Sequence, residues 1–164
     1  MPTMWMLIGV PASGKSTWVS NQGFDPEHTV IISTDKFIDA EAARQGKTYS
    51  EVFSSTIKRA TAIMNADLDM AIKDGMDIVW DQTNTTVKSR AAKLTRLPAS
   101  YRKVAVYFPT PDDAELKRRL ASRPGKTIPA NIVLGMKSQL EPPTASEGSD
   151  DEHPSASLRH SEET

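Results

Sequence analysis

Short apolar runs of strand length alternate along this chain with longer stretches that have helical spacing. The runs that predict strands are Met4–Val10, Thr29–Ser33, Asp77–Trp80 and Lys103–Phe108. Helices are predicted at Lys15–Asn21, Tyr49–Lys73, Val87–Leu97, Pro111–Ala121 and Pro129–Leu140. This alternation is typical of a parallel sheet flanked by helices, so we expect an α/β fold with four to five strands. In such sheets ligands bind beyond the carboxyl ends of the strands, which makes the residues directly after each strand the first candidates for chemistry.

The segment after the first predicted strand, Gly9–Ser16, matches the phosphate-binding pattern GxxxxGK[ST] in full. It also lies where this chemistry requires, after a strand and at the start of a helix. The amides of such a loop and the helix N-terminus attract phosphates, the lysine contacts the β- and γ-phosphates, and the hydroxyl coordinates Mg²⁺. We therefore expect ATP and Mg²⁺ as cofactors. The residues expected to bind the nucleotide are Gly9, Pro11, Ala12, Ser13, Gly14, Lys15, Ser16 and Thr17.

The second predicted strand runs into Ser33, Thr34 and Asp35. A carboxylate at this end of the sheet, beside the phosphate loop, can accept the proton of an attacking hydroxyl group. Asp35 is therefore a candidate general base that also binds the acceptor. All three residue types also favour helix N-termini, so helix capping is an alternative role that does not exclude catalysis.

The third predicted strand runs into Asp81, Gln82, Thr83 and Asn84. Asp81 follows an apolar run and is a candidate to hold Mg²⁺ through water, together with Ser16. Thr83 and Asn84 offer short polar groups for binding substrate. The alternative for Asn84 is a strand-to-helix turn in which Thr and Asn only cap the next helix.

Five basic residues gather between Lys117 and Lys126, at the end of a predicted helix and the start of a loop marked by Pro and Gly. Arg119 and Arg123 are four residues apart and share one helical face if the helix continues that far. Two guanidinium groups on a hinged loop can close over a triphosphate and neutralise the charge that develops during transfer. This predicts a small basic lid, although a helix C-terminus also favours basic residues through its dipole alone.

Charge divides the chain into two parts. Seven of its 21 acidic residues and one of its 20 basic residues lie in residues 141–164, which leaves 14 acidic and 19 basic residues, a formal charge of +5, in residues 1–140. A basic body suits a polyanionic partner such as nucleic acid. The last segment has almost no apolar residue, so we expect a catalytic domain at 1–140 and a disordered acidic tail at 141–164.

Composition also excludes some classes of protein. The chain has no cysteine, which rules out disulfide frameworks and thiolate metal sites. Its longest apolar run, Met4–Val10, is far shorter than the roughly 20 residues that span a bilayer. We expect a soluble cytoplasmic protein with no membrane association, and the sequence indicates no obligate protein partner.

Taken together, these segments resemble the kinase domain of phage and metazoan polynucleotide 5′-hydroxyl kinases. The matching segments are Ile8–Trp18, Ser33–Asp35, Asp81–Asn84, and Arg119 with Arg123 followed by Lys126–Pro129. They span nearly all of residues 4–140. The resemblance implies that Lys15 and Ser16 hold phosphates and metal, that Asp35 is the general base, and that Arg119 and Arg123 form the lid.

The expected activity is transfer of the γ-phosphoryl group of ATP to a hydroxyl on DNA or RNA. Phage members of the family carry an arginine three residues after the catalytic aspartate, where this chain has Ile38. That departure keeps open a hydroxymethylated base in DNA or a small alcohol as the acceptor. A nucleoside kinase and an ATP-gated nucleic-acid-binding module without transfer are further alternatives. Tyr49 and Phe53 lie one turn apart and either stack bases or pack in the core.

Overall fold

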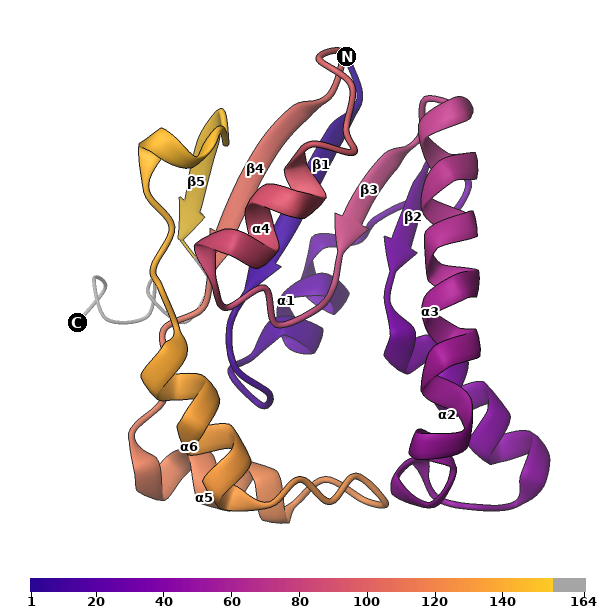
Figure 1. Cartoon of the computed structure of the whole chain (residues 1–164), viewed down its shortest axis with the longest axis vertical. Coiled ribbons are helices and arrows are strands. Elements are labelled where there is room, and N and C mark those ends of the chain that lie inside the picture. Colours follow the sequence, from indigo (N-terminus) through magenta and orange to yellow (C-terminus); the bar gives the residue numbers. More distant parts are fainter. Residues whose placement is uncertain (155–164) are drawn as a thin grey trace.

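The computed structural model describes residues 1–154, and their strands form one parallel sheet (Figure 1). The strands are β1 (Thr3–Ile8), β2 (Thr29–Ile32), β3 (Asp77–Trp80), β4 (Arg102–Tyr107) and β5 (Asp151–Pro154). Their order across the sheet is β2-β3-β1-β4-β5, and every neighbouring pair is parallel. The α/β fold with four to five strands is confirmed.

Six α-helices connect or follow these strands within the described residues. They are α1 (Lys15–Gln22), α2 (Thr34–Gln45), α3 (Tyr49–Lys73), α4 (Val87–Leu94), α5 (Asp113–Ala121) and α6 (Ala130–Gln139). The predicted bounds of α3 are reproduced. None of the described helices has the length and apolar character needed to cross a membrane.

The sequence pattern did not predict α2. This helix buries only Ile38, Glu41 and Ala42, so its apolar stripe is too narrow to stand out in the sequence. Its start is nevertheless marked, because the Ser33 hydroxyl caps it by accepting a hydrogen bond from the Asp35 backbone N–H at 3.1 Å. The capping alternative therefore holds for Ser33.

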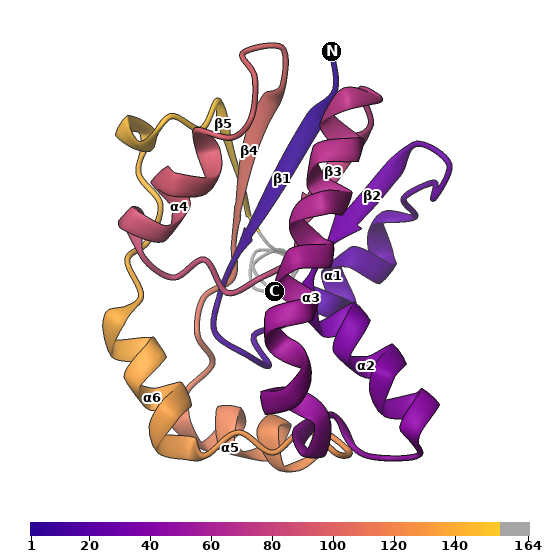
Figure 2. The same ribbon diagram turned by 45° about the vertical axis from the view of Figure 1, so that its right-hand side comes forward.

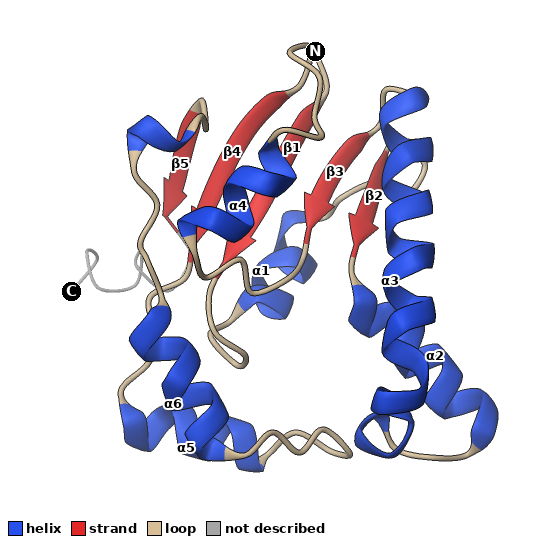
Figure 3. Ribbon diagram, viewed as in Figure 1, coloured by secondary structure: helices blue, strands red, loops and turns tan. Residues whose placement is uncertain are grey.

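Alternating side chains of the strands build two separate cores, one on each face of the sheet. Met4, Met6 and Ile8 of β1 point to the face that α3 and α4 cover, where they meet Leu68 and Leu94. Trp5 and Leu7 point to the opposite face, which α1 covers with Trp18 and Val19. Figure 3 shows α3 and α4 on the near side of the sheet and α1 on the far side.

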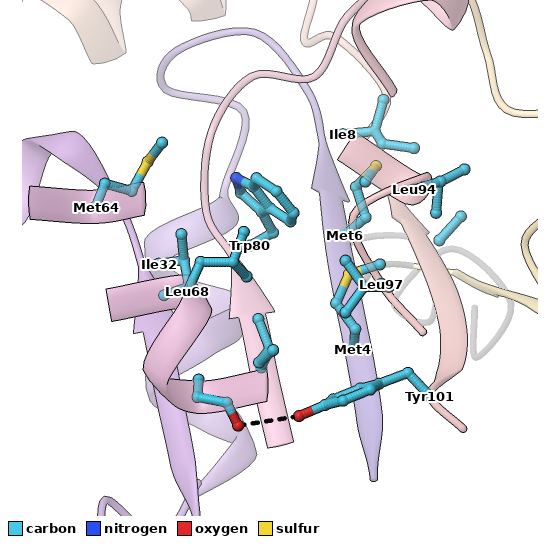
Figure 4. Close-up of a cluster of buried hydrophobic side chains, with 13 residues drawn as sticks. Met4, Met6, Ile8, Ile32, Met64, Leu68, Trp80, Leu94, Leu97 and Tyr101 are labelled. Atoms are coloured by element: carbon cyan, nitrogen blue, oxygen red, sulfur yellow. Dashed lines mark hydrogen bonds between the residues drawn. The ribbon is translucent and has the colours of Figure 1, made fainter. Parts of the chain in front are cut away.

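The larger core is closed at one end by a tyrosine (Figure 4). The buried Tyr101 hydroxyl donates to the backbone carbonyl oxygens of Ala71 at 3.2 Å and Met76 at 2.6 Å. These contacts tie the chain segment before β4 to the last turn of α3. The opposite end of the core lies under the carboxyl ends of the strands, where the polar residues gather.

Residues 141–154 are the first part of the segment whose composition predicted a disordered acidic tail, and they contain two short elements. A short 3-10 helix (Ala145–Glu147) precedes β5, and β5 pairs with β4. Glu147 forms an ion pair with the buried Arg90 of α4, with 2.7 Å between its Oε1 and the Nε of Arg90. Arg90 has a side chain only 2% exposed and needs a counter-charge, which explains why a polar segment is held in place. The rest of the predicted tail, 155–164, lies outside the described residues.

Candidate active site

The phosphate loop joins β1 to α1 in a tight curl. Ala12 and Gly14 have positive φ angles of 66° and 108°, which place their backbones in the left-handed region. Gly14 is also the N-cap of α1 and makes no side-chain capping bond, so the first amides of α1 stay available for an anion. Gly9 is required by packing, because a Cβ atom there would lie 2.9 Å from the Cβ of Phe108.

Lys15 lies across this loop. Its Nζ donates to the carbonyl oxygens of Gly9 at 2.7 Å and Val10 at 2.9 Å. Burial lowers the pKa of Lys15 from 10.5 to about 8, an effect that Asp81 opposes. A buried ammonium group held by carbonyl oxygens alone is poorly neutralised, so a phosphate at this place would supply the missing negative charge.

The phosphate loop opens into a cavity of about 1000 Å³ at the carboxyl ends of the strands. The phosphate loop forms one side of the cavity, and the N-terminal parts of α2 and α3 form another. The segment from α5 to α6 completes the cavity. Figure 2 shows α5 and α6 beyond the same end of the sheet as the phosphate loop. The lining includes the expected site residues Pro11, Ala12, Ser13, Gly14, Lys15, Ser16, Thr17, Asp35, Asp81, Thr83, Arg119 and Arg123.

Asp35 enters this cavity from the first turn of α2. Its side chain is exposed, and its Oδ1 accepts a hydrogen bond from the Tyr49 hydroxyl at 2.5 Å. Asp35 also contributes to the electrostatic environment of Lys15 and Asp81, which places the three groups within reach of one another. The carboxylate and the phosphate loop therefore share one site, as general-base catalysis requires.

Asp81 follows β3 and lines the same cavity as the loop. Burial raises the pKa of this carboxyl, while Lys15 opposes the change. Ser16 lies at the start of α1 on the same cavity. Because Mg²⁺ is commonly held by one or two protein oxygens together with phosphate oxygens, the pair fits a nucleotide-bound metal. Within residues 1–154, no group of three or more acidic, histidine or cysteine side chains gathers to hold a metal alone.

Asn84 differs from its expected role in substrate binding. Its side chain is buried at 2% exposure, outside the cavity lining, and its Nδ2 donates to the Leu7 carbonyl oxygen at 2.7 Å. The amide oxygen accepts a hydrogen bond from Lys93. With both ends engaged and a φ of 48°, Asn84 fixes the turn after β3 against β1. Thr83 does line the cavity, and its carbonyl oxygen accepts the Gly9 N–H at 3.0 Å.

Both lid arginines line the cavity, one from a helix and the other from the loop that follows it. Arg119 lies in the last turn of α5, where its Nη1 donates to the Ala12 carbonyl oxygen at 3.2 Å and its Nε donates to Glu115 at 2.8 Å. Arg123 lies beyond the end of the helix. Its Nη1 is buried and has no hydrogen-bond partner among the described residues.

The residues present fit a magnesium-bound triphosphate. The α1 N-terminus is uncapped, Lys15 is buried and bonded to carbonyl oxygens, and the buried Nη1 of Arg123 and Oγ of Ser13 have no partner among the described residues. Buried polar groups in proteins are otherwise nearly always paired. Phosphate oxygens would satisfy such donors.

The sequence did not predict one part of the site. This part is the corner where the lid loop, residues 122–129 between α5 and α6, meets the start of α3. Tyr49 and Lys126 both line the cavity, and the Lys126 Nζ lies 4.8 Å from the centre of the Tyr49 ring. One signal was available, because Thr48 and Glu51 form a capping box that marks where α3 begins. No signal in the sequence indicated that the lid loop would reach this point.

Comparison with known proteins agrees with this geometry. The AAA domain family model AAA_33 matches residues 4–143. A chain of the Pnkp1/Rnl/Hen1 RNA repair complex is 23% identical, with a TM-score of 0.64 over 85% of this chain and 44% of that chain. A putative kinase from Chloroflexus aurantiacus J-10-fl is 18% identical, with a TM-score of 0.67 over 93% of this chain and 84% of that chain. An unliganded sugar kinase from Janibacter sp. HTCC2649 is 17% identical, with a TM-score of 0.58 over 94% and 86%.

These solved structures share the fold at low identity, and this chain spans less than half the length of the RNA repair chain. The family match covers most of the chain and includes the phosphate loop, Asp35, Asp81 and both lid arginines. Within the matched residues, the phosphate loop and the cavity beside it fit a nucleotide bound with Mg²⁺. The chain belongs to the AAA domain family AAA_33 and has the P-loop kinase fold.

Proposed function

We propose that this protein transfers the γ-phosphoryl group of ATP to a hydroxyl group of a nucleic acid, with the 5′-hydroxyl of a polynucleotide as the leading acceptor. One observation carries the proposal. The Asp35 carboxylate and the phosphate loop line a single cavity, and Arg119 and Arg123 line it as well. This arrangement serves group transfer to an alcohol, since a binding module has no need of a carboxylate beside the phosphates.

ATP with Mg²⁺ would supply the transferable phosphoryl group and the ADP leaving group. Asp35 accepts the proton of the acceptor hydroxyl. At the same time the hydroxyl oxygen of the acceptor bonds to the γ-phosphorus, and the bond from that phosphorus to the ADP oxygen breaks. Lys15, Arg119 and Arg123 neutralise the charge on the transferring group. Asp35 then releases its proton to solvent, which restores the site.

Three observations favour nucleic acid as the acceptor. Residues 1–140 carry a formal charge of +5, which suits a polyanion. The fold is similar to that of a chain in the Pnkp1/Rnl/Hen1 RNA repair complex. The exposed position of Asp35 also suits the end of a large substrate more than a fully enclosed small one.

The proposal is tested with γ-labelled ATP and a panel of acceptors. The panel holds RNA and DNA oligonucleotides with 5′-hydroxyl ends, the same oligonucleotides with 5′-phosphate ends, a hydroxymethylated duplex, nucleosides and sugars. We expect label on the 5′-hydroxyl oligonucleotides and none on their 5′-phosphate counterparts. ATP-stimulated oligonucleotide binding without any labelled product would contradict transfer and support the binding-module alternative.

The Asp35→Asn variant separates catalysis from nucleotide binding. We expect kcat to fall by about 10²- to 10⁴-fold, because general-base catalysis contributes about that much, while the Kd for ATP changes little. Asp74→Asn is the matched control, since Asp74 is the exposed C-cap of α3, outside the cavity. An Asp35→Asn enzyme with full kcat would remove the carboxylate from the mechanism.

A small alcohol is a second candidate acceptor, because α2 offers no cation to grip an acceptor phosphate. Ile38 is fully buried, packed with Ala42, Val52 and Ala60. Lys36 lies outside the cavity lining, and its Nζ donates to the Ile31 carbonyl oxygen at 3.3 Å. The similarity to a sugar kinase agrees with this candidate. Label on sugars or nucleosides, with none on oligonucleotides, would decide in its favour.

A further inference from the structure

The first turn of α3 holds the lid loop by hydrogen bonds that the backbone and side chain of Ser50 form. The Ser50 N–H donates to the Gly125 carbonyl oxygen at 3.1 Å, and the Thr127 N–H donates to the Ser50 Oγ at 2.9 Å. Gly125 also lies so close to Thr48 that a Cβ atom at Gly125 would be 3.1 Å from the Cβ of Thr48. The lid loop is therefore closed against α3 in this structure, as its path in Figure 1 shows.

The side chain of Lys126, in the middle of this loop, adds two further contacts. Its Nζ forms an ion pair with Asp39 of α2, with 3.1 Å between Nζ and Oδ2. The same Nζ lies 4.8 Å from the centre of the Tyr49 ring, within the range of a cation–π contact. The closed lid thus rests on Tyr49.

The opposite end of Tyr49 contacts Asp35. Its hydroxyl donates to Asp35 Oδ1 at 2.5 Å, a separation typical of a strong hydrogen bond to a carboxylate. Burial, reinforced by Asp35, raises the pKa of Tyr49, so the hydroxyl stays protonated and acts as a donor. Because Oδ1 is engaged, Oδ2 is the oxygen left to accept the proton of an acceptor hydroxyl.

We infer that Tyr49 is a positioning residue, whose hydroxyl orients the Asp35 carboxylate and whose ring makes this orientation depend on the closed lid through Lys126. The inference rests on the proposed function, because it assigns Asp35 the task of accepting a proton. It connects two events, since the base is held in its working orientation when the lid covers the phosphates. Tyr49 itself neither gains nor loses a proton.

A purely structural role for Tyr49 predicts a different result. Its ring lies near Phe53, with 5.7 Å between the ring centres, and a phenylalanine would keep that contact and the contact with Lys126. Tyr49→Phe removes only the hydrogen bond to Asp35. If the hydroxyl served stability alone, the variant would unfold more easily and retain its kcat.

The test is Tyr49→Phe in steady-state and single-turnover assays of the full chain. We expect kcat to fall by about 10- to 100-fold, in line with the loss of orientation at a reacting group, while KM for ATP and the Tm change little. Tyr101→Phe is the matched control, because among residues 1–154 the Tyr101 hydroxyl forms hydrogen bonds with backbone carbonyl oxygens of the core, away from the cavity. That variant should lose stability and keep its kcat.

Two double variants sharpen the result. In an Asp35→Asn background, Tyr49→Phe should cause no further loss, because there is no carboxylate left to orient. Lys126→Met should lower kcat less than Tyr49→Phe, and the two effects should not add, because any effect of Lys126 on Asp35 passes through the Tyr49 hydroxyl that Tyr49→Phe removes.

Slow hydrolysis of ATP without acceptor, where water replaces the hydroxyl, is measured in parallel so that the result does not depend on the acceptor. Full kcat in Tyr49→Phe, or an equal loss in the Asp35→Asn background, overturns the inference and leaves the proposed function intact. A wild-type protein that turns over ATP neither with acceptors nor with water overturns the proposed function, and the inference falls with it.

Discussion

The phosphate loop and the corner where the lid meets α3 serve one cavity but are built in opposite ways. In the loop, Lys15 reaches the carbonyl oxygens of residues five and six positions earlier. At the corner, Tyr49 and Asp35 are 14 positions apart, and Lys126 and Asp39 are 87 apart. The loop is a local structure with a motif, whereas the corner exists only because the fold brings three segments together.

The comparison shows where each kind of site is sensitive. A local loop keeps its shape as long as its own residues are intact, since its contacts cost little chain entropy to form. A corner made from distant segments depends on the position of α2, α3 and the lid at once. We therefore expect substitutions in the loop to remove function abruptly, and substitutions of Tyr49 or Lys126 at the corner to weaken it by degrees.

Among the cationic residues of the cavity, the largest effect is expected from Lys15→Ala. Loss of a preorganised charge at the transferring phosphate should lower kcat/KM by about 10³-fold and weaken ATP binding. Lys88→Ala is the control, because Lys88 lies on α4, outside the cavity. Isothermal titration with ATP and initial rates measure both quantities. A Lys15→Ala enzyme whose kcat/KM stays within about tenfold of wild type would contradict the phosphate-loop assignment.

Arg123→Ala should have the next largest effect, about 10²-fold on kcat, because the buried Nη1 of Arg123 has no partner among the described residues and is free to meet a phosphate. Arg119→Ala should cost less, since Arg119 is also engaged with Glu115 and Ala12. Arg118→Ala tests the specificity of the effect, as Arg118 lies on the same helix outside the cavity. Equal losses at all three positions would indicate a diffuse charge effect.

Glu147→Gln tests a third contact between distant segments, one that lies away from the cavity. Removing the charge opposite the buried Arg90 should lower the free energy of unfolding by about 2 kcal/mol and leave kcat unchanged. Glu27→Gln is the exposed control. Urea titrations give the free energies, and a loss of kcat without loss of stability would contradict this assignment.

The same variant has a defined pH dependence. Burial opposes ionisation of Glu147, but its hydrogen bonds with Arg90 and Thr144 outweigh burial and lower its pKa below the ordinary 4.5. A carboxyl with a lowered pKa in the folded state stabilises the protein above its unfolded-state pKa and loses this contribution as the pH falls. The stability difference between wild type and Glu147→Gln should therefore be full at neutral pH and shrink below pH 4.5.

The smallest loss of stability is expected from Gly125→Ala in the lid loop. Its φ of 68° and the close approach of Thr48 disfavour a side chain, so we expect a cost of about 1 kcal/mol that loosens the closed lid and lowers kcat about fivefold. Gly135→Ala is the control, because Gly135 lies within α6 with open space around it and should be neutral or stabilising. Similar kcat values for the two variants would show that lid closure does not limit turnover.

The alternation of apolar runs was sufficient to predict the parallel sheet, and α3 was predicted to the residue. The phosphate loop, Asp35, Asp81 and the lid arginines were all predicted from residue type and position after a strand or helix, and they line one cavity. These features are local, because a strand, the turn after it and the next helix are formed by consecutive residues. The helix α2 was missed because it buries too few apolar residues to show a periodic stripe.

Only the tertiary structure decided the rest. Composition predicted a disordered segment after residue 140, yet Glu147 is drawn to the fold by Arg90, a partner 57 positions away. Asn84 was a candidate for substrate binding until Leu7 of β1 and Lys93 of α4 proved to occupy both ends of its amide. The hold of Tyr49 on Asp35 likewise depends on how α2 and α3 pack. The physical reason is the same in each case. The contribution of a polar side chain to stability or function depends on its hydrogen-bond or ion-pair partner, and sequence alone does not identify a distant partner.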